Sequence, residues 1–353
     1  MMKKFAVFSG FLGSGKTTAM MALTRYYTEH YAKAAMISND LSEGNNLADN
    51  RLAQLSGCIA SEITGECICY CHDVLTERLN AYYDDGCELV VSDIPGFGVG
   101  ALEHVYHGLA AEYPGQYELG PFTVLIEPEN AKLLLSGKNA DMTHILDAQL
   151  READLIVLNK RDLLGKNETE SVLSGLASKY PETQVIAISA VRGEGLEELS
   201  QALRSGEASL RHPNIDYVGE GLQKEMGSLS EYYIQYHAVV CCNDFDGTAY
   251  LEGIASEVQD GVRACGCEIP HLKLLAWGQE GDYGKVDLLG TGRPIEITRR
   301  FERPCTELAV VINASAACPD TKLDEIITNA VSEVSERFQL EVMIFRKECF
   351  GMG

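Results

Sequence analysis

Residues 4–18 read KFAVFSGFLGSGKTT and decide the fold of the first part of the chain. The apolar run 5–8 is typical of a buried strand, and the residues after Ser9 match the pattern G-x-x-x-x-G-K-[ST]. Glycines suit such a loop because its backbone bends tightly and points N–H groups at phosphate oxygens. We therefore predict a phosphate-binding loop between a strand and a helix, in which Lys16 reaches the β- and γ-phosphates and Thr17 binds Mg²⁺. The residues expected to contact the nucleotide here are Gly10, Gly13, Ser14, Gly15, Lys16, Thr17 and Thr18.

Short apolar runs alternate with longer amphipathic segments up to about residue 205. The expected strands are 4–8, 34–38, 88–93, 122–126, 155–159 and 184–188, and helical patterns fall at 17–30, 73–83, 102–112 and 169–179. Runs rich in Val, Ile and Leu indicate strands buried on both faces, as in a parallel sheet. The alternation predicts an α/β domain over residues 1–205, of the three-layer P-loop NTPase class with a mostly parallel sheet.

The composition shifts after residue 205. Residues 206–228 are rich in Gly, Ser and Glu and weakly periodic, which predicts a linker. Beyond it, strands are expected at 232–241, 272–277, 285–289, 295–299, 307–313 and 341–346, with helices at 248–262 and 323–338. A helix after the first strand and another before the last strand predict a smaller C-terminal α+β sandwich domain over residues 229–353.

Two further motifs indicate which nucleotide binds. The apolar strand at 88–93 ends in Asp93, where a P-loop fold places a catalytic carboxylate that serves Mg²⁺. Residues 159–162 read NKRD after another apolar strand and match the guanine signature N-K-x-D. An Asp carboxylate accepts hydrogen bonds from guanine N1–H and the exocyclic amine, which adenine does not offer. The residues expected to hold the base are Asn159, Lys160 and Asp162, with Ser189 and Ala190 in the loop that covers it.

The formal net charge of −23 argues against a nucleic-acid or anionic-membrane partner, because no basic field attracts phosphate groups. No apolar stretch approaches the roughly 18 residues of a membrane helix. The N-terminal Lys3 and Lys4 precede an apolar run, but that run passes directly into the glycine-rich loop rather than a cleavage site. We therefore expect a cytoplasmic protein, whose twelve cysteines are reduced thiols or metal ligands rather than disulfides.

A cysteine cluster follows the first two predicted strands. Residues 65–72 read GECICYCH, and in an extended segment residues two apart point to the same side. Cys67, Cys69 and Cys71 are therefore expected to converge as thiolate ligands of a transition metal. The alternative is that they pack as small hydrophobic side chains. Cys58 lies nearby in sequence and is a substitute ligand. A weaker second set, Cys265 and Cys267 with His271 downstream, stays open as a second site.

These motifs together resemble the CobW-type GTP-binding metallochaperones, relatives of the urease and hydrogenase nickel-insertion GTPases. The resemblance rests on residues 10–18, Asn39-Asp40, the cysteine cluster and the NKRD motif, and covers about the first 205 residues well. It implies that GTP, Mg²⁺ and a second metal bind one domain, and that Asp40 helps to hold Mg²⁺. This chain departs from the family's C-x-C-C pattern, because Tyr70 takes the last position and the third thiol moves to Cys71. Asp93 also replaces the usual Glu.

The leading hypothesis is a GTP-hydrolysing metallochaperone. It binds a transition metal, with Zn²⁺ favoured over Co²⁺ and Ni²⁺, and couples the GTP state to metal delivery or maturation of a client enzyme. The alternative is a regulatory GTPase that controls assembly of a cofactor-dependent enzyme without carrying metal. A small-molecule kinase is disfavoured, because such kinases have no use for N-K-x-D. The sequence is compatible with a homodimer but does not determine the oligomeric state.

Overall fold

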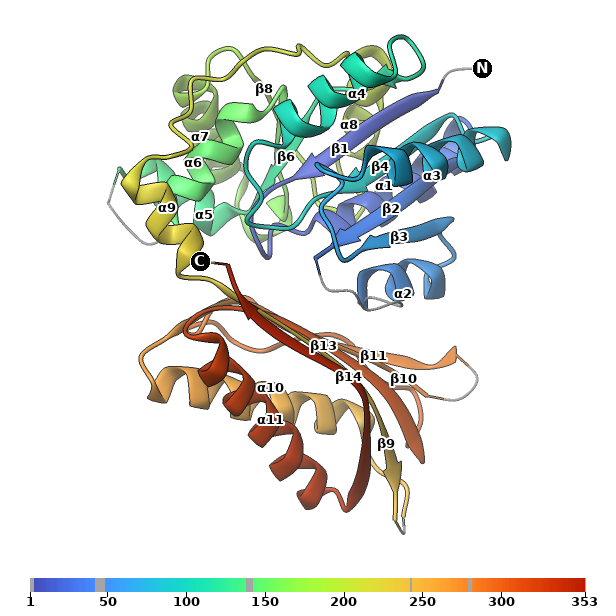
Figure 1. The fold of residues 1–353 in the computed structure, drawn as a ribbon, viewed down its shortest axis with the longest axis vertical. Coiled ribbons are helices and arrows are strands. Elements are labelled where there is room, and N and C mark those ends of the chain that lie inside the picture. Colours follow the sequence, from blue (N-terminus) through green and yellow to red (C-terminus); the bar gives the residue numbers. More distant parts are fainter. Residues whose placement is uncertain (1–2, 42–47, 138–141, 242, 279–280, 353) are drawn as a thin grey trace. The chain divides into compact units, whose positions relative to one another are not determined.

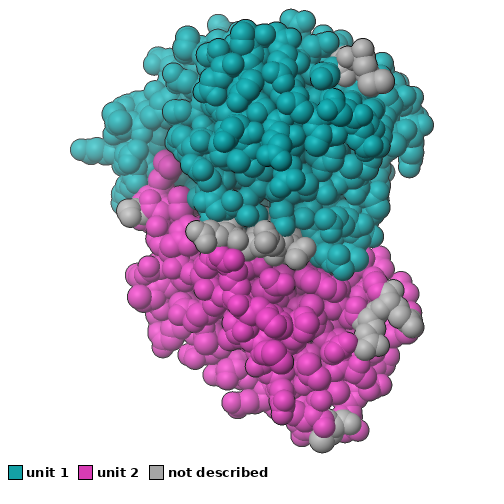
Figure 2. Space-filling view, turned by 45° about the vertical axis from the view of Figure 1, so that its right-hand side comes forward, with its two compact units in different colours: residues 1–45, 49–225 teal, residues 46–48, 226–353 magenta. Residues whose placement is uncertain are grey.

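The computed structural model describes residues 3–41, 48–137, 142–241, 243–278 and 281–352. It divides into two compact units, one of residues 1–45 and 49–225 and the other of residues 46–48 and 226–353 (Figure 2). No described helix is long and apolar enough to cross a membrane. Each unit has its own sheet and its own hydrophobic core.

The first unit is built on a parallel sheet with strand order β3-β2-β4-β1-β6-β7-β8, and β5 pairs beside β1 (Figure 1). Its strands are β1 (Lys4–Ser9), β2 (Ala34–Asp40), β3 (Ala60–Thr64), β4 (Leu89–Asp93), β5 (Glu118–Leu119), β6 (Thr123–Ile126), β7 (Leu155–Leu158) and β8 (Gln184–Ala187). All six residues of β1 are buried, because helices cover both faces of the sheet. The predicted α/β P-loop class is confirmed.

The helices of this unit form two layers. They are α1 (Lys16–His30), α2 (Ala48–Leu55), α3 (His72–Asp84), η1 (Leu102–His107), α4 (Gly108–Glu112), α5 (Pro128–Leu135), α6 (Thr143–Glu152), η2 (Arg161–Leu163), α7 (Lys166–Lys179), α8 (Leu196–Ser205) and α9 (Glu220–Gly227). Phe5 and Val7 of β1 join the core cluster beneath α3, η1, α5 and α7. Helices α1 and α8 pack together on the opposite face.

Strand β3 lies at the sheet edge and had no sequence signal. Only Ile63 of its five residues is buried, so neither an apolar run nor a clean alternation marks it.

The segment predicted as a linker is hydrogen-bonded along the first unit up to residue 225. Ala208 N–H donates to Leu119 O at 2.9 Å, and the Arg211 guanidinium donates to Ala153 O at 2.7 Å. Glu225 accepts from the backbone N–H groups of His144 and Ile145. Contacts of this kind join groups that are distant in sequence and leave no apolar pattern, so the polar composition of residues 206–228 does not indicate them.

The second unit is an antiparallel sheet of order β12-β11-β10-β13-β9-β14, covered on one face by two helices (Figure 1). Its elements are β9 (Ser230–Val240), α10 (Gly247–Ala264), β10 (Glu268–Trp277), β11 (Tyr283–Leu288), β12 (Glu296–Arg299), β13 (Glu307–Ala317), α11 (Asp320–Arg337) and β14 (Leu340–Gly351). The core lies between the sheet and the helices, among residues such as Ile234, Leu251 and Ile327. The predicted α+β sandwich is confirmed as one sheet with one helical layer.

Candidate functional site

The phosphate-binding loop lies between the end of β1 and the start of α1, as predicted. Gly10, Gly13 and Gly15 all have positive φ, of 131°, 76° and 86°. At Gly10 a Cβ atom would lie 2.2 Å from Leu125 O, and at Gly15 it would lie 2.4 Å from Asn159 Nδ2. Both the backbone conformation and the close neighbours therefore require glycine at these two positions.

The polar groups of the loop fit a bound phosphate. Lys16 Nζ donates to Gly10 O at 2.6 Å, so the ammonium group lies across the loop. Ser14 N–H donates to Phe11 O at 3.1 Å. Within the described chain the Ser14 hydroxyl is buried and has no hydrogen-bond partner. A buried hydroxyl without a partner is unfavourable, and a phosphate oxygen would satisfy it. Thr17 and Thr18 follow in the first turn of α1 and are partly exposed.

Two of the predicted Mg²⁺ ligands, Asp40 and Asp93, lie together at the carboxyl ends of paired parallel strands. Asp93, the last residue of β4, is the register partner of Phe8 on β1 and is 4% exposed. Its Oδ1 accepts from Asn39 N–H of β2 at 2.8 Å, and Asp40 is the next residue along β2. The carboxylates of Asp40 and Asp93 and the hydroxyl of Thr17, at the start of α1, are the oxygen ligand types that Mg²⁺ prefers. Thr17, Asp40 and Asp93 therefore fit Mg²⁺, which when bound would neutralise charge on the phosphates.

The guanine motif follows β7, and its first residue bonds to two loops of the protein. Asn159 Nδ2 donates to Ser14 O at 2.9 Å, and its Oδ1 accepts from Ala190 N–H at 3.2 Å. Asn159 thus connects the phosphate-binding loop to the predicted base-covering loop. Lys160 has φ 59°, and Asp162 lies in the short helix η2 that follows.

The loop that carries Asp162 is held against the loop after β8. Arg161 N–H donates to Ile188 O at 3.0 Å, and Arg192 Nε lies 3.9 Å from Asp162 Oδ2. Ser189 Oγ accepts from Arg192 N–H at 3.2 Å. The predicted base-binding residues are therefore assembled from two strand ends.

Three residues that the sequence did not indicate hold the segment after Asp93. Gln149 Nε2 donates to the carbonyl oxygens of Gly96 and Gly98, both at 3.0 Å. Glu152 accepts from Gly100 N–H and from Tyr217 OH, the latter at 3.0 Å. Burial raises the pKa of Glu152 to about 7, and these hydrogen bonds limit the rise. In an amphipathic helix, buried polar residues of this kind carry no sequence signal.

The cysteine cluster forms a turn rather than the extended segment that was predicted. Tyr70 N–H donates to Cys67 O at 2.9 Å, which closes the turn. Cys67 and Cys69 come together, with their sulfur atoms 2.8 Å apart. The Cys71 thiol instead donates to Cys67 O at 3.4 Å, at the start of α3. Cys58 lies elsewhere, against Thr24 and Met21 of α1.

The described part of the chain holds no group of three or more His, Cys, Asp or Glu side chains positioned to bind a metal. The expected convergence of Cys67, Cys69 and Cys71 is therefore reduced to the first two thiols. The hydrogen bond from Cys69 keeps the pKa of the Cys67 thiol below its ordinary value, and the same contact raises the pKa of Cys69.

Asn39 connects the cysteine turn to the nucleotide side of the site. Its Nδ2 donates to Ile63 O at 3.1 Å and to Glu66 O at 2.8 Å, and its Oδ1 accepts from Ile68 N–H at 3.0 Å. Its own backbone N–H binds Asp93. One residue, 6% exposed, therefore contacts both a predicted Mg²⁺ ligand and the backbone beside Cys67.

The weaker candidate set is not brought together as predicted. Cys265 and Cys267 lie at the end of α10 beside Cys318. His271 is inside β10, close enough to Asp287 of β11 to act on it electrostatically.

Comparison with known proteins agrees with this site. Residues 4–187, more than half of the chain, match the family described as the CobW/HypB/UreG nucleotide-binding domain. The zinc chaperone YeiR of Escherichia coli (strain K12) is 30% identical over 165 residues, which are 46% of this chain and 47% of that protein. The match thus spans about half of the relative's length.

Solved structures are similar at lower identity. The hydrogenase maturation factor HypB from Archaeoglobus fulgidus is 20% identical with a TM-score of 0.39, over 57% of this chain and 88% of that chain. The Zn(II)-bound YjiA GTPase from E. coli is 13% identical with a TM-score of 0.36, over 93% of this chain and 98% of that chain. On the family match over residues 4–187, the chain belongs to the CobW/HypB/UreG family and is a P-loop GTPase of the CobW type.

Proposed function

We propose that this GTPase delivers a transition metal, and that GTP binding and hydrolysis control whether the Cys67–Cys69 turn holds the ion. The observation that carries the proposal is the double role of Asn39, which contacts Asp93 through its backbone and the cysteine turn through its side chain. Zn²⁺ is the favoured cargo, since the E. coli relative is named a zinc chaperone. Co²⁺ and Ni²⁺ are the alternatives.

The coupling runs through short, buried connections. Asp93 and Asp40, the carboxylates at the ends of β4 and β2, would hold the Mg²⁺ that accompanies the nucleotide. A shift of Asp93 is transmitted to Asn39 N–H over 2.8 Å, and from the Asn39 amide to the carbonyls and N–H of the turn. Hydrolysis removes the γ-phosphate, so the segments around Asp93 and Asp40 lose an interaction that ordered them. Because such coupling is reciprocal, bound metal must change the affinity for GTP by the same factor.

The thiols suit a soft or borderline metal cargo. Cys67 and Cys69 supply two sulfur ligands, and Cys71 follows the turn at the start of α3. Thiols bind metal as thiolates, so binding releases protons and strengthens as the pH rises. We place the reaction in the cytoplasm, with a client metalloenzyme as recipient of the ion.

A second candidate function has an observation in its favour. The Cys71 thiol points to Cys67 O, and only two sulfur atoms meet. A regulatory GTPase acting on assembly of a cofactor-dependent enzyme would need no third ligand, and its cysteines would be structural or redox-active.

Metal content and GTP affinity distinguish the two functions. The wild-type protein, the double variant C67S/C69S and the control C241S, which changes an exposed cysteine in the second unit, are loaded with Zn²⁺ and dialysed. Metal delivery predicts about one ion per chain in wild type and control, and none in the double variant. It also predicts that Zn²⁺ changes the affinity for a non-hydrolysable GTP analogue by about 5-fold or more, as is typical of coupled sites. Equal metal content in all three proteins, or a GTP affinity indifferent to Zn²⁺, contradicts metal delivery.

A further inference from the structure

Three cysteines from distant parts of the chain meet at one end of the second unit. Helix α10 ends at Ala264 and is capped by Cys265, and Gly266 with φ 68° turns the chain so that Cys267 N–H donates to Val262 O at 3.1 Å. Strand β10 then begins at Glu268, whose register partner is Ala317, the last residue of β13.

The next pair outward in that register is Cys267 with Cys318. The backbone around both cysteines is fixed. Cys318 O accepts from Ser230 Oγ at 2.7 Å, and Cys267 O accepts from Thr291 Oγ1 at 3.4 Å. Cys267 Sγ lies 3.9 Å from Cys265 O, and the Cys267 and Cys318 side chains are close enough to influence each other's pKa. Residues that face each other in an antiparallel pair have Cα atoms about 4.5–5.5 Å apart, which lies within the range that a disulfide spans.

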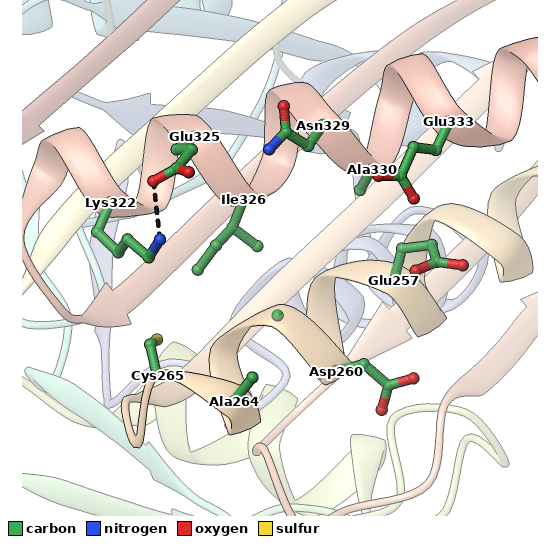
Figure 3. A pocket seen from close by; sticks show the side chains of 11 residues that line it. Glu257, Asp260, Ala264, Cys265, Lys322, Glu325, Ile326, Asn329, Ala330 and Glu333 are labelled. Atoms are coloured by element: carbon green, nitrogen blue, oxygen red, sulfur yellow. Dashed lines mark hydrogen bonds and ion pairs between the residues drawn. The ribbon is translucent and has the colours of Figure 1, made fainter.

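The three thiols differ in how they can be reached. Cys265 is exposed, Cys267 is partly buried and Cys318 is buried. Cys265 also lines a groove of about 370 Å³ between α10 and α11, and Lys322 lies at the same end of that groove (Figure 3). Lys322 Nζ donates to Glu325 Oε2 at 2.8 Å and also acts electrostatically on Cys265 and Cys267. A small disulfide in solution therefore reaches Cys265 first, because it is the exposed thiol of the three.

We propose that Cys265, Cys267 and Cys318 form a thiol–disulfide exchange site that takes a low-molecular-weight disulfide as its oxidant and ends as a Cys267–Cys318 disulfide. The site lies in the second unit and does not depend on the proposed metal delivery. In a reducing compartment such a disulfide forms transiently and reports a change in redox state.

Each step balances in atoms and electrons. The Cys265 thiolate attacks one sulfur of the small disulfide RSSR, forming Cys265–S–S–R and releasing the first thiolate RS⁻. Cys267 then attacks the Cys265 sulfur, forming Cys265–Cys267 and releasing the second RS⁻. Cys318 attacks the Cys267 sulfur, which forms Cys267–Cys318 and returns Cys265 as a thiol. In total two protein thiols lose two electrons to RSSR, and their two protons appear on two molecules of RSH.

The end point follows from burial. A Cys265–Cys267 disulfide would remain in an exposed turn, open to attack by the released thiol. Cys318 is 5% exposed, so a Cys267–Cys318 bond is shielded from that reverse reaction.

Differential alkylation with peptide mass spectrometry tests the proposal on the full chain. Metal-free protein is incubated with oxidised glutathione, blocked, digested and mapped. The wild type should lose two of its twelve alkylatable thiols and the control C241S two of its remaining eleven, and both should yield a Cys267–Cys318 cross-linked peptide. C265S should give the same cross-link at least tenfold more slowly, and C318S should stop at Cys265–Cys267.

Two results overturn the proposal. One is that Cys267 and Cys318 in the wild type stay as reducible and alkylatable as they were before treatment. The other is that oxidation is confined to Cys67 and Cys69, whose sulfur atoms also touch. Both of these results are measured on the wild-type protein, so the test does not depend on whether C318S folds. If C318S does not fold, C318A is used in its place.

Discussion

Replacing Asn39 by alanine should disconnect the cysteine turn from the nucleotide site while leaving the nucleotide site itself in place. The variant N39A loses three side-chain hydrogen bonds, to Ile63 O, Glu66 O and Ile68 N–H. It keeps the backbone N–H that binds Asp93, since any residue at this position supplies that group.

The expected loss of stability follows from these contacts. Each of the three hydrogen bonds contributes roughly 0.5–1.5 kcal/mol, so the free energy of unfolding should fall by about 1.5–4.5 kcal/mol. The effect on coupling is separate. Coupling between two sites is typically about 1–3 kcal/mol, a factor of roughly 5–150 in affinity, and N39A should reduce this factor towards one.

The assay is titration of a fluorescent, non-hydrolysable GTP analogue with and without saturating Zn²⁺. The matched control is N159A, which removes another buried asparagine that bonds to Ser14 O and Ala190 N–H. N39A should bind the analogue within about threefold of wild type without metal, because Asp93 keeps its backbone partner. N159A should bind it more weakly but keep the wild-type coupling factor. Urea denaturation of both variants shows that each remains folded at the assay temperature.

Different failures have different meanings. If wild type shows no effect of Zn²⁺ on GTP affinity, metal delivery itself is contradicted. If wild type is coupled and N39A is coupled equally, the route through Asn39 is wrong while metal delivery stands.

Three further predictions concern single positions of the site. G15A should lower nucleotide affinity at least tenfold in the same titration, since its Cβ lies 2.4 Å from Asn159 Nδ2 at φ 86°; unchanged affinity would show that the loop adapts. D162A should weaken GTP binding by roughly 100-fold with ATP binding unchanged, measured by competition, because a charged acceptor for guanine is lost; an equal effect on both nucleotides contradicts this. The folded protein favours the protonated form of Glu152. The contribution of this carboxyl group to the free energy of unfolding is therefore complete below pH 4.5 and is lost as the pH rises to about 7. As the pH rises from 5 to 8, the free energy of unfolding of E152Q should fall less than that of metal-free wild type, by up to about 3 kcal/mol in urea denaturation. An identical pH dependence of the two proteins would refute the buried-acid argument.

The parts of the site that sequence predicted are those with local causes. A strand, a glycine-rich turn and a helix start follow one another within residues 4–18, so their geometry is determined by neighbouring residues. The same holds for the carboxylate that ends β4 and for the NKRD turn after β7. Parallel pairing then brings these strand ends to one edge of the sheet, which the alternating pattern already implied.

The errors came from patterns with more than one structural solution. Cysteines at every second position fit a strand, but the same spacing fits the turn closed by Tyr70 N–H and Cys67 O, which separates Cys71 from the other two thiols. His271 follows Cys267 closely in sequence, yet the register of β10 against β13 gives Cys267 the distant Cys318 as its neighbour. Sequence spacing does not determine register between non-adjacent segments.

Two buried asparagines show why the coupling route was beyond sequence reasoning. Asn39 and Asn159 each lie at the carboxyl end of a parallel strand, and each bonds to loops that are remote in sequence. Asn159 connects the phosphate-binding loop to the predicted base-covering loop, so it joins two loops that are predicted to bind the same nucleotide. Asn39 fixes Asp93 to the cysteine turn, so it joins parts that the proposal assigns to two different ligands. An amide is suited to both positions, because it donates and accepts at once and satisfies backbone groups of both kinds. The chemistry of the two residues is the same, and only the loops that meet at each one decide whether it stabilises a site or connects two.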